Sequence, residues 1–485
     1  MLWGRRRARL TAAAAGVVAA TLLFTGCSAH LDAGTSGSQL AERELSQLDG
    51  VQSVRGSGTN NLPFSGAVSV DIVARDGLPD SRLQTLTDDV GRWVVKHSGS
   101  GTTYSAHLEA DGFGFSLRRR ASENKRLLTV VDSLRKGGRW LGGSVTSDAP
   151  GGTNTARIDL AVKTPADLLT GWTTVRKAGS ASGWKDVAVS ASAWNTPPKD
   201  TELLRNADLS ITDSVAGTKG TVGDPTPEVS AYQQVVAKHR VTDATVSPGR
   251  VHLHLADLAD VADAAAVIKR VAPATDAVLD GGIITKEFPE SDGSLSKGAD
   301  YAEADRLAAI ANHAGVTAIS LRPDWVTVTA NGPGNVAPIA RALAAASPAA
   351  PVTSIDVGSN ARAADGDVTA GLLVSGAPTL LVTSAQVGEQ LRGYLPASSS
   401  LFPSRKAVTA TVPDVGAVSA LVRALKPLLP DGTSLSIALP GGSVGDSAHL
   451  TVHGGTLTID PVRDGSTSSA TTTALNTAGR DAWNS

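Results

Sequence analysis

The amino-acid sequence predicts an α+β fold made of tandem sandwich repeats, and three observations lead to that prediction. Five strands of alternating polarity occur along the 485-residue chain, each is followed by a short polar residue, and each polar residue precedes an amphipathic helix. The polar residues recur 78 to 93 positions apart: Asp80, Thr164, Asp257, Asn335 and Asp414. A unit that returns at near-constant spacing is the sequence signature of a repeat architecture.

The five strands are predicted from their period of two. They cover residues 67–73, 156–162, 250–255, 325–330 and 407–412. Apolar and polar residues alternate in each, with many β-branched side chains, which is typical of a strand that buries one face.

The helices are predicted from spacings of three and four residues. Leu83, Leu86, Val90 and Trp93, for example, share one helical face. Three further helices each lead into another strand, over residues 123–136, 227–239 and 302–314. The order helix–strand–strand–helix–strand predicts βαββαβ or αββαβ sandwiches, with two helices on one face of an antiparallel sheet.

The N-terminus has the pattern of a secretory signal. Arg5, Arg6, Arg7 and Arg9 form a positive flank, and residues 10–24 are an uncharged run that is shorter than the roughly 20 residues of a membrane span. We therefore predict a signal peptide over residues 1–26 and export of the chain.

The segment Leu23-Phe24-Thr25-Gly26-Cys27 resembles the lipobox of bacterial lipoproteins. The resemblance implies cleavage between Gly26 and Cys27, a diacylglyceryl thioether on Cys27, and attachment to the extracytoplasmic face of the cell membrane. Acyl chains contribute about 0.8 kcal/mol per buried CH₂, so such an anchor is firm. The alternative is an ordinary signal peptide in which the single cysteine of the chain is incidental.

Charge and composition exclude several functions. Hydrophobic residues make up 41 % of the chain and charged residues 19 %, which excludes wholesale disorder. The formal charge of -2 argues against a nucleic-acid partner, and one cysteine excludes an intramolecular disulfide or a cysteine zinc cluster. Without residues 1–26 the charge becomes -6, with 40 basic against 46 acidic residues, so the lipid alone is expected to hold the protein at an anionic leaflet.

The predicted domain organisation follows the repeats and the loops between them. After the signal peptide we expect a lipid-anchored tether over residues 27–40. The tether is followed by five α+β units and a disordered tail, over residues 41–111, 112–198, 199–286, 287–360, 361–460 and 461–485.

The units have the strand and helix order of ferredoxin-like folds, and their order also resembles the BON domain of bacterial envelope proteins. The segment 308–357 carries this second resemblance best, with strands 316–321, 326–330 and 352–357 and a glycine, Gly332, shortly after the second strand. The resemblance implies envelope attachment and contact with lipid.

Two motifs are candidates for chemistry. Gly441-Gly442-Ser443-Val444-Gly445 matches the G-x-S-x-G pattern of a nucleophile elbow, although Pro440 precedes it and a predicted hairpin follows. His252 and His254 lie two apart on one strand, and His449 and His453 lie four apart, so the members of each pair face one way and suit zinc or copper. The simpler interpretations are a glycine loop and solvent-facing strand positions.

Two further groups are candidates for binding. Trp140, Trp172, Trp184 and Trp194 either fill the core or stack on sugars. A basic cluster either forms a solvated face or contacts headgroups or wall polymer; its members are Arg118, Arg119, Arg120, Lys125 and Arg126.

The sequence thus leaves two hypotheses. The first is a non-catalytic binding or scaffold lipoprotein of the cell envelope, anchored through Cys27, without a cofactor or metal, whose partner is an envelope protein, a lipid or a wall polymer. The second is an anchored hydrolase or metal-binding protein that uses Ser443 or the His252/His254 pair.

Overall fold

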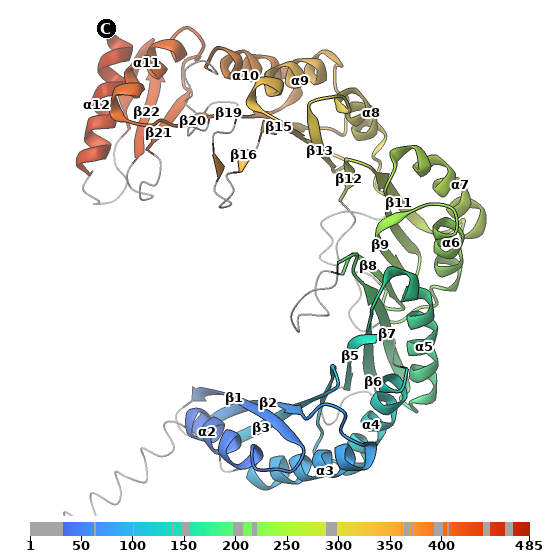
Figure 1. Cartoon of the computed structure of the whole chain (residues 1–485). Coiled ribbons are helices and arrows are strands. Elements are labelled where there is room, and N and C mark those ends of the chain that lie inside the picture. The colour runs from blue at the N-terminus through green and yellow to red at the C-terminus, as the bar shows by residue number, and fades with distance from the viewer. Residues whose placement is uncertain are drawn as a thin grey trace, which may run out of the picture. The chain divides into compact units, whose positions relative to one another are not determined.

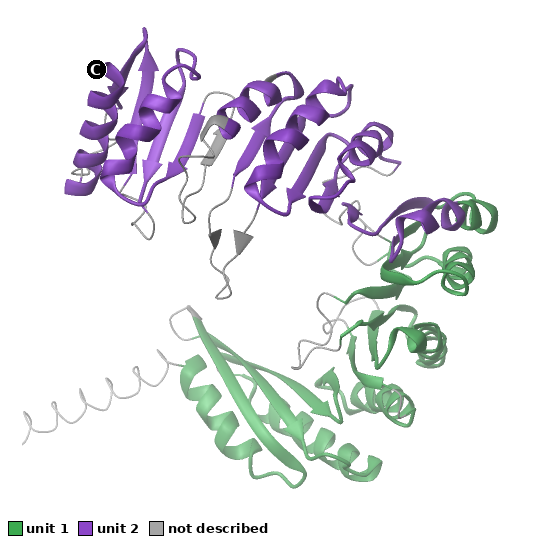
Figure 2. Ribbon diagram, turned by 45° about the horizontal axis from the view of Figure 1, so that its top comes forward, with its two compact units in different colours: residues 1–252, 266–275 green, residues 253–265, 276–485 purple. Residues whose placement is uncertain are grey.

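The computed structural model describes residues 33–62, 65–99, 101–137, 140–147, 155–196, 207–215, 221–287, 298–359, 361–362, 368–369, 372–391, 401–404, 407–439, 447–460 and 469–485. Two compact units divide the chain (Figure 2). Unit 1 contains residues 1–252 and 266–275, and unit 2 contains residues 253–265 and 276–485. The predicted signal peptide, Cys27 and Ser443 lie outside the described residues.

Unit 1 is a sheet whose strands lie in the order of the sequence (Figure 1). Its strands are β1 (Val51–Leu62), β2 (Ser65–Ala74), β3 (Thr102–Ala110), β4 (Phe113–Ser116), β5 (Trp140–Ser147), β6 (Thr155–Val162), β7 (Asp186–Ala193), β8 (Leu209–Thr212) and β9 (Val241–Ser247). Its helices are α2 (Ala33–Leu45), α3 (Asp80–His97), α4 (Ala121–Arg135), the short η1 (Pro165–Asp167), α5 (Leu168–Ala181) and α6 (Thr226–Val236).

Parallel and antiparallel pairs alternate through this sheet. Strands β1 and β2, β3 and β4, β5 and β6, and β7 and β8 pair antiparallel. The pairs β2–β3, β4–β5, β6–β7 and β8–β9 are parallel, and a helix joins the two strands of each. A parallel neighbour needs such a crossover connection, whereas a hairpin gives an antiparallel one. The helices cover one face of the sheet (Figure 1).

The boundary between the units falls in β10 (Arg250–Leu255) and α7 (Val261–Val271), with η2 (Leu258–Asp260) between them. Unit 2 continues with β11 (Asp276–Gly281), β12 (Ile284–Lys286), α8 (Ala302–Ala311), β13 (Val316–Leu321), β14 (Trp325–Ala330), α9 (Pro333–Ala345), β15 (Ser354–Ser359), β16 (Ala361–Arg362), β17 (Val368–Thr369), β18 (Leu373–Gly376) and α10 (Pro378–Leu391). Strands β16 and β17 form a small sheet of their own. A five-stranded sheet contains β19 (Leu401–Ser404), β20 (Ala407–Thr411), β21 (Ser434–Ala438), β22 (Ser447–His453) and β23 (Thr456–Ile459), with α11 (Val415–Leu425) and α12 (Ala470–Asn484).

The prediction of mixed helices and strands around sheets is confirmed, but the antiparallel sheet is wrong. In unit 2 the pairs β12–β13, β14–β15 and β20–β21 are again parallel and joined by helices. Each helix returns the chain to the strand directly beside the one it left, so no strand separates the two. A continuous hydrophobic cluster, from Val278 to Trp483, connects the strands β11 to β15 and β18 with the five-stranded sheet.

Two of the five predicted capping residues accept a hydrogen bond from the first turn of a helix. Asp257 accepts one from the Ala259 N–H at 2.9 Å, and Asp414 accepts one from the Ala417 N–H, also at 2.9 Å. Asn335 lies inside α9 instead, because Pro333 begins that helix directly after Gly332. Proline favours the first helical position, where its missing N–H is not needed.

Both ends of the described chain differ from expectation. The predicted tether 27–40 includes the start of α2, so that prediction is wrong from residue 33 onward. The predicted disordered tail 461–485 includes α12, so that prediction is wrong for residues 470–484. No helix among the described residues combines the length and apolar character needed to cross a bilayer.

Candidate functional site

A groove on unit 1 separates the C-terminal half of α3 from the start of α4. It has a volume of about 600 Å³, and we call it the α3–α4 groove. Its lining includes Gly91, Arg92, Val95, Lys96, Arg119 and Asn124. Val95 is 49 % exposed, so the groove combines an apolar surface with cationic side chains.

A buried asparagine fixes the backbone at this groove. The Asn124 side chain is 1 % exposed, and its Oδ1 accepts a hydrogen bond from the Arg118 N–H at 2.7 Å. Its Nδ2 donates to the Arg118 carbonyl at 2.9 Å. The oxygen and the nitrogen of one side-chain amide therefore both hold the segment that leads into α4. A Cβ added at Gly91 would lie 3.1 Å from Asn124 Nδ2, so α3 approaches this segment closely where it carries glycine.

The charged side chains that line the groove are three cations, Arg92, Lys96 and Arg119, and one acid, Asp88. Arg92 forms an ion pair with Asp89, and Asp88, the acidic residue of the lining, accepts a hydrogen bond from Gln84 at 3.1 Å. Among the described residues, Lys96 and Arg119 have no ion-pair partner, and both are exposed. The N-terminal end of the α4 dipole adds partial positive charge on the same side.

The start of α2 lies at the same end of unit 1 as this groove. Strands β2 and β3 both begin there, since Gly66 pairs with Thr102. A Cβ added at Gly66 would lie 2.5 Å from the Gly34 nitrogen, so the first turn of α2 touches this end of the sheet. Helix α3 ends at His97, five residues before β3 begins, so its last turns reach this end as well.

An aromatic cluster ties α2 to α3. The Trp93 indole donates to Glu44 Oε2 at 2.8 Å, and the rings of Trp93 and His97 stack with centroids 4.2 Å apart. Tyr104 on β3 packs edge-on against Trp93, with centroids 5.0 Å apart. Burial, and then the Glu44 charge, raise the pKa of the Tyr104 phenol.

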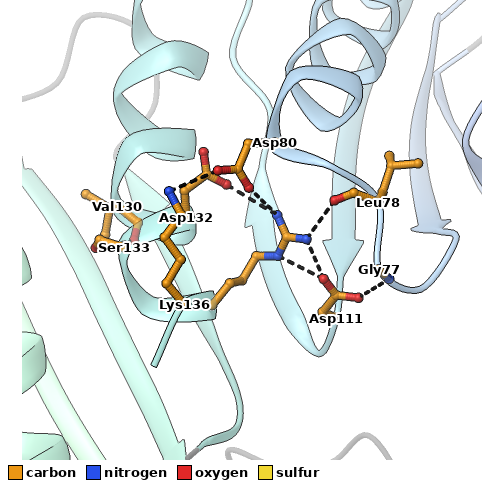
Figure 3. Close-up of polar contacts among 9 residues, drawn as sticks. Gly77, Leu78, Asp80, Asp111, Val130, Asp132, Ser133 and Lys136 are labelled. Atoms are coloured by element: carbon orange, nitrogen blue, oxygen red, sulfur yellow. Dashed lines mark hydrogen bonds and ion pairs between the residues drawn. The ribbon is translucent and has the colours of Figure 1, made fainter. Parts of the chain in front are cut away.

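An arginine at the opposite end of α4 holds α3 and α4 together. The Arg135 guanidinium bonds to Asp111 in the β3–β4 turn, to Asp132 at 3.3 Å and to the Leu78 carbonyl at 3.1 Å, and Asp80 lies 3.6 Å away (Figure 3). Burial acts to raise the pKa of Asp111, but hydrogen bonds from the Gly77 N–H and from Arg135 lower it below its ordinary value. This network fixes the start of α3 against the end of α4.

The predicted histidine pairs lie on β10 and β22. His254 pairs through Nδ1 with Asp280 Oδ1 at 2.6 Å, and Asp280, 1 % exposed, belongs to unit 2 as His254 does. His449 and His453 are exposed on β22, and His449 Nε2 lies 3.0 Å from Ser447 Oγ. No three His, Cys, Asp or Glu side chains within the described ranges are placed to hold a metal ion.

The predicted binding residues are divided among several places. Trp172 and Trp194 are buried, as the core interpretation predicts, whereas Trp140 and Trp184 are half-buried. In the basic cluster, Arg119 lines the α3–α4 groove, Arg120 pairs with Glu123, and Arg118 donates through Nε to Ser147 at 2.9 Å.

Sequence reasoning missed the contribution of α3 to the groove. Arg92 and Lys96 lie four residues apart, on the side of α3 that lines the groove, and that spacing could have identified them. Comparisons with protein-family models, with curated proteins and with solved structures find no match to the chain.

Proposed function

We propose that the chain is an extracytoplasmic lipoprotein, anchored through a lipid on Cys27, that acts as a non-catalytic binding and scaffold module of the bacterial cell envelope. One observation carries the proposal: α2 begins at Ala33, six residues after Cys27, at the end of unit 1 that holds the α3–α4 groove. Six residues span at most about 20 Å. An anchor on Cys27 therefore keeps this end of unit 1 near the membrane.

The partner proposed for the groove is the anionic surface of that membrane. Lys96 and Arg119 offer two unpaired cations, and Val95 offers exposed apolar surface between the helices. A basic residue close to an anionic leaflet contributes about 1 kcal/mol. The net charge of the whole chain predicts no adhesion, but these local charges support a second, electrostatic contact beside the lipid.

The finer description of the units belongs to the same proposal. We propose that they are BON-like αββαβ repeats, which supply a scaffold beyond the membrane. Support comes from the order of α8, β13, β14, α9 and β15, in which β13 and β14 pair antiparallel and β14 and β15 pair parallel. The same hairpin and crossover recur in unit 1.

The anchor is tested by replacing Cys27 in the full chain. Cys27→Ala removes the thiol that carries the lipid, so the protein should leave the membrane fraction or remain as the uncleaved precursor. Intact mass and radiolabelled palmitate incorporation measure the modification directly. Unchanged mass and unchanged fractionation of the variant would refute the anchor.

The groove is tested apart from the anchor, with residues 28–485, which retain every described element. Vesicles with and without phosphatidylglycerol are sedimented with the protein. Lys96→Glu combined with Arg119→Glu should weaken binding to anionic vesicles at least tenfold, as two contacts of about 1 kcal/mol predict. Arg423→Glu with Lys426→Glu makes the same charge change at two exposed positions, one in the last turn of α11 and one directly after it, and should leave binding unchanged. Equal loss in both double variants would count against the groove.

A further inference from the structure

A second hollow of unit 1 lies at the C-terminal end of α5, beside β7 and the end of β8. Its volume is about 390 Å³, and we call it the α5 hollow. Its lining includes Arg176, Ser180, Trp184, Lys185, Asp213 and Val222. The hollow lies outside the α3–α4 groove and shares none of its lining residues.

The turn that follows α5 places Trp184 in the lining of this hollow. Gly183 has a φ of +74°, a conformation that glycine adopts without strain, and it turns the chain after the helix. The Ser182 hydroxyl donates to the Gly179 carbonyl at 2.6 Å and accepts from the Trp184 N–H at 3.3 Å. Trp184 thus sits in a fixed turn, half-buried, with the Arg126 guanidinium 5.9 Å from its ring centroid.

An arginine on α5 is held in place beside the same hollow. The Arg176 guanidinium lies 5.6 Å from the Trp172 ring centroid, 3.5 Å from Asp224 and 3.2 Å from the Thr226 hydroxyl. Its side chain remains partly exposed. A guanidinium oriented by three neighbours loses little further freedom when it binds a ligand, because its position is already determined.

A carboxyl group completes the polar lining. Asp213 follows β8 directly, and its Oδ1 accepts a hydrogen bond from the Val189 N–H at 2.7 Å. Burial raises the pKa of Asp213 to about 6, although the charges of Arg176 and Arg157 oppose the shift. Keeping a partly buried carboxylate in a surface hollow costs stability at neutral pH, and such groups concentrate at functional sites.

We infer that the α5 hollow binds a saccharide. The indole of Trp184 supplies an aromatic surface for the C–H face of a sugar ring, as aromatic side chains do in binding sites. Asp213 supplies an acceptor for a sugar hydroxyl group, and Arg176 supplies the N–H donors that are not directed at Asp224 and Thr226. The two cations, Arg176 and Lys185, balance the two acids of the lining, Asp186 and Asp213, which suits an uncharged ligand.

The apolar part of the hollow narrows the ligand class. Val187 and Val222 line it together with Trp184, and Val222 is among the exposed large hydrophobic residues. A methyl group on the ligand would cover these side chains. An N-acetylated amino sugar, as in the glycan of a bacterial wall, carries both the hydroxyl groups and the methyl group. The protein would then bind glycan at α5 in addition to the membrane contact proposed above.

The test uses residues 28–485, so its outcome does not depend on lipidation or on the vesicle assay. The two probes are a soluble trimer of N-acetylglucosamine, observed by saturation-transfer NMR, and purified insoluble peptidoglycan, observed by sedimentation. Trp184→Ala should lower binding of both probes at least fivefold, and Trp184→Phe should retain most of it. Trp325→Ala removes an exposed tryptophan of unit 2 and should leave binding unchanged.

A second variant keeps the test decisive if Trp184→Ala fails to fold by circular dichroism. Arg176→Gln changes a partly exposed side chain and should also lower binding at least fivefold. The inference is overturned if the unmodified protein binds neither probe, or if Arg176→Gln and a folded Trp184→Ala bind like the unmodified protein. An equal loss in Trp325→Ala also overturns it.

Discussion

Helices α2 and α12, near the two ends of the chain, pack on their sheets in contrasting ways. Helix α12 buries large side chains, since Leu475 is fully buried and Trp483 is 2 % exposed and donates its indole N–H to the Gly455 carbonyl at 3.1 Å. Helix α2 buries small residues instead: Ala33, Gly34, Gly37, Ser38 and Ala41, with Leu45 at its end. The interface of α12 with its sheet is packed with large apolar side chains, whereas the interface of α2 depends on the close approach of the helix and strand backbones.

The strands beneath α2 make that approach possible. A Cβ added at Gly58 would lie 2.0 Å from the Gly34 carbonyl oxygen, and one added at Gly56 would lie 2.8 Å from the Ser38 carbonyl oxygen. Glycine is therefore required on both sides of the interface, where helix and strand backbones meet. The contrast teaches that a helix of small polar residues can dock firmly if the surface beneath it is equally small.

The largest expected effect tests the α12 side of the comparison. Trp483→Ala should lower the free energy of unfolding of unit 2 by about 4 kcal/mol, because it removes a large buried ring and leaves a cavity. Urea unfolding measures the loss, and hydrogen exchange of residues 470–484 shows whether α12 detaches. Trp325→Ala, at a 40 % exposed position, should cost about 1 kcal/mol or less. Similar losses in both variants would mean that α12 contributes little to unit 2.

The next effect tests the α2 side. Gly58→Ala should lower the free energy of unfolding by about 2 to 3 kcal/mol, because the new methyl group meets backbone that cannot rotate away. Increased hydrogen exchange in residues 33–45 should accompany the loss. Gly332→Ala places a methyl group where no atom lies within 4 Å and should change stability by only about a few tenths of a kcal/mol. A stable Gly58→Ala variant with protected α2 would contradict close docking.

The caps of the two helices give a smaller, matched pair of effects. Ser469 accepts a hydrogen bond from the Thr472 N–H at 3.0 Å, whereas the Gly34 N–H at the start of α2 donates to Asn60, 26 residues away, at 2.7 Å. Ser469→Ala and Asn60→Ala should each cost about 1 kcal/mol. Hydrogen exchange should rise in α12 alone for the first variant, but in both α2 and the β1–β2 hairpin for the second. Unchanged exchange in the hairpin would show that Asn60 does not couple it to α2.

The smallest effect concerns the charge that joins α2 to α3. Glu44→Gln keeps an acceptor for the Trp93 indole, so this partly buried hydrogen bond is retained and the free energy of unfolding should change by less than about 1 kcal/mol. The pKa of Tyr104 should fall, because the Glu44 charge helps to raise it after burial. Because the phenol pKa is higher in the folded than in the unfolded protein, protonated Tyr104 contributes fully to the free energy of unfolding below pH 10. That contribution is lost as pH rises further. Ultraviolet titration of phenolate measures this, and Tyr104→Phe identifies the Tyr104 signal.

Strong alternation made several elements predictable from the sequence. Strands β10 and β14 agree with prediction residue for residue, because Val251, Leu253 and Leu255 alternate with polar side chains, as do Val326 and Val328. Helices α4, α6 and α8 were also located within a few residues of their bounds. In each case the spacing of apolar residues within the element is enough to predict it, without knowledge of contacts to distant parts of the chain.

The elements that depend on distant contacts were missed. Helix α2 consists of residues typical of a linker, and its cap, Asn60, comes from another strand. In helix α12 the buried residues Leu475, Gly479 and Trp483 have helical spacing, but they lie among Thr, Ala and Asn. The apolar pattern is therefore too weak to predict a helix from the sequence. The candidate sites show the same limit, since Arg119 and Trp184 are identified from the sequence, but Asp213 reaches the α5 hollow only through the fold.

The strand order of unit 1 has a consequence for how the protein is made. Strands β1 to β9 lie side by side in the order in which the ribosome synthesises them. Each newly delivered strand can pair at once with its predecessor, so folding need not wait for the C-terminus, and contacts local in sequence favour rapid folding. Duplication or deletion of one hairpin and its crossover helix would leave the other pairings intact, which allows such a chain to change length during evolution.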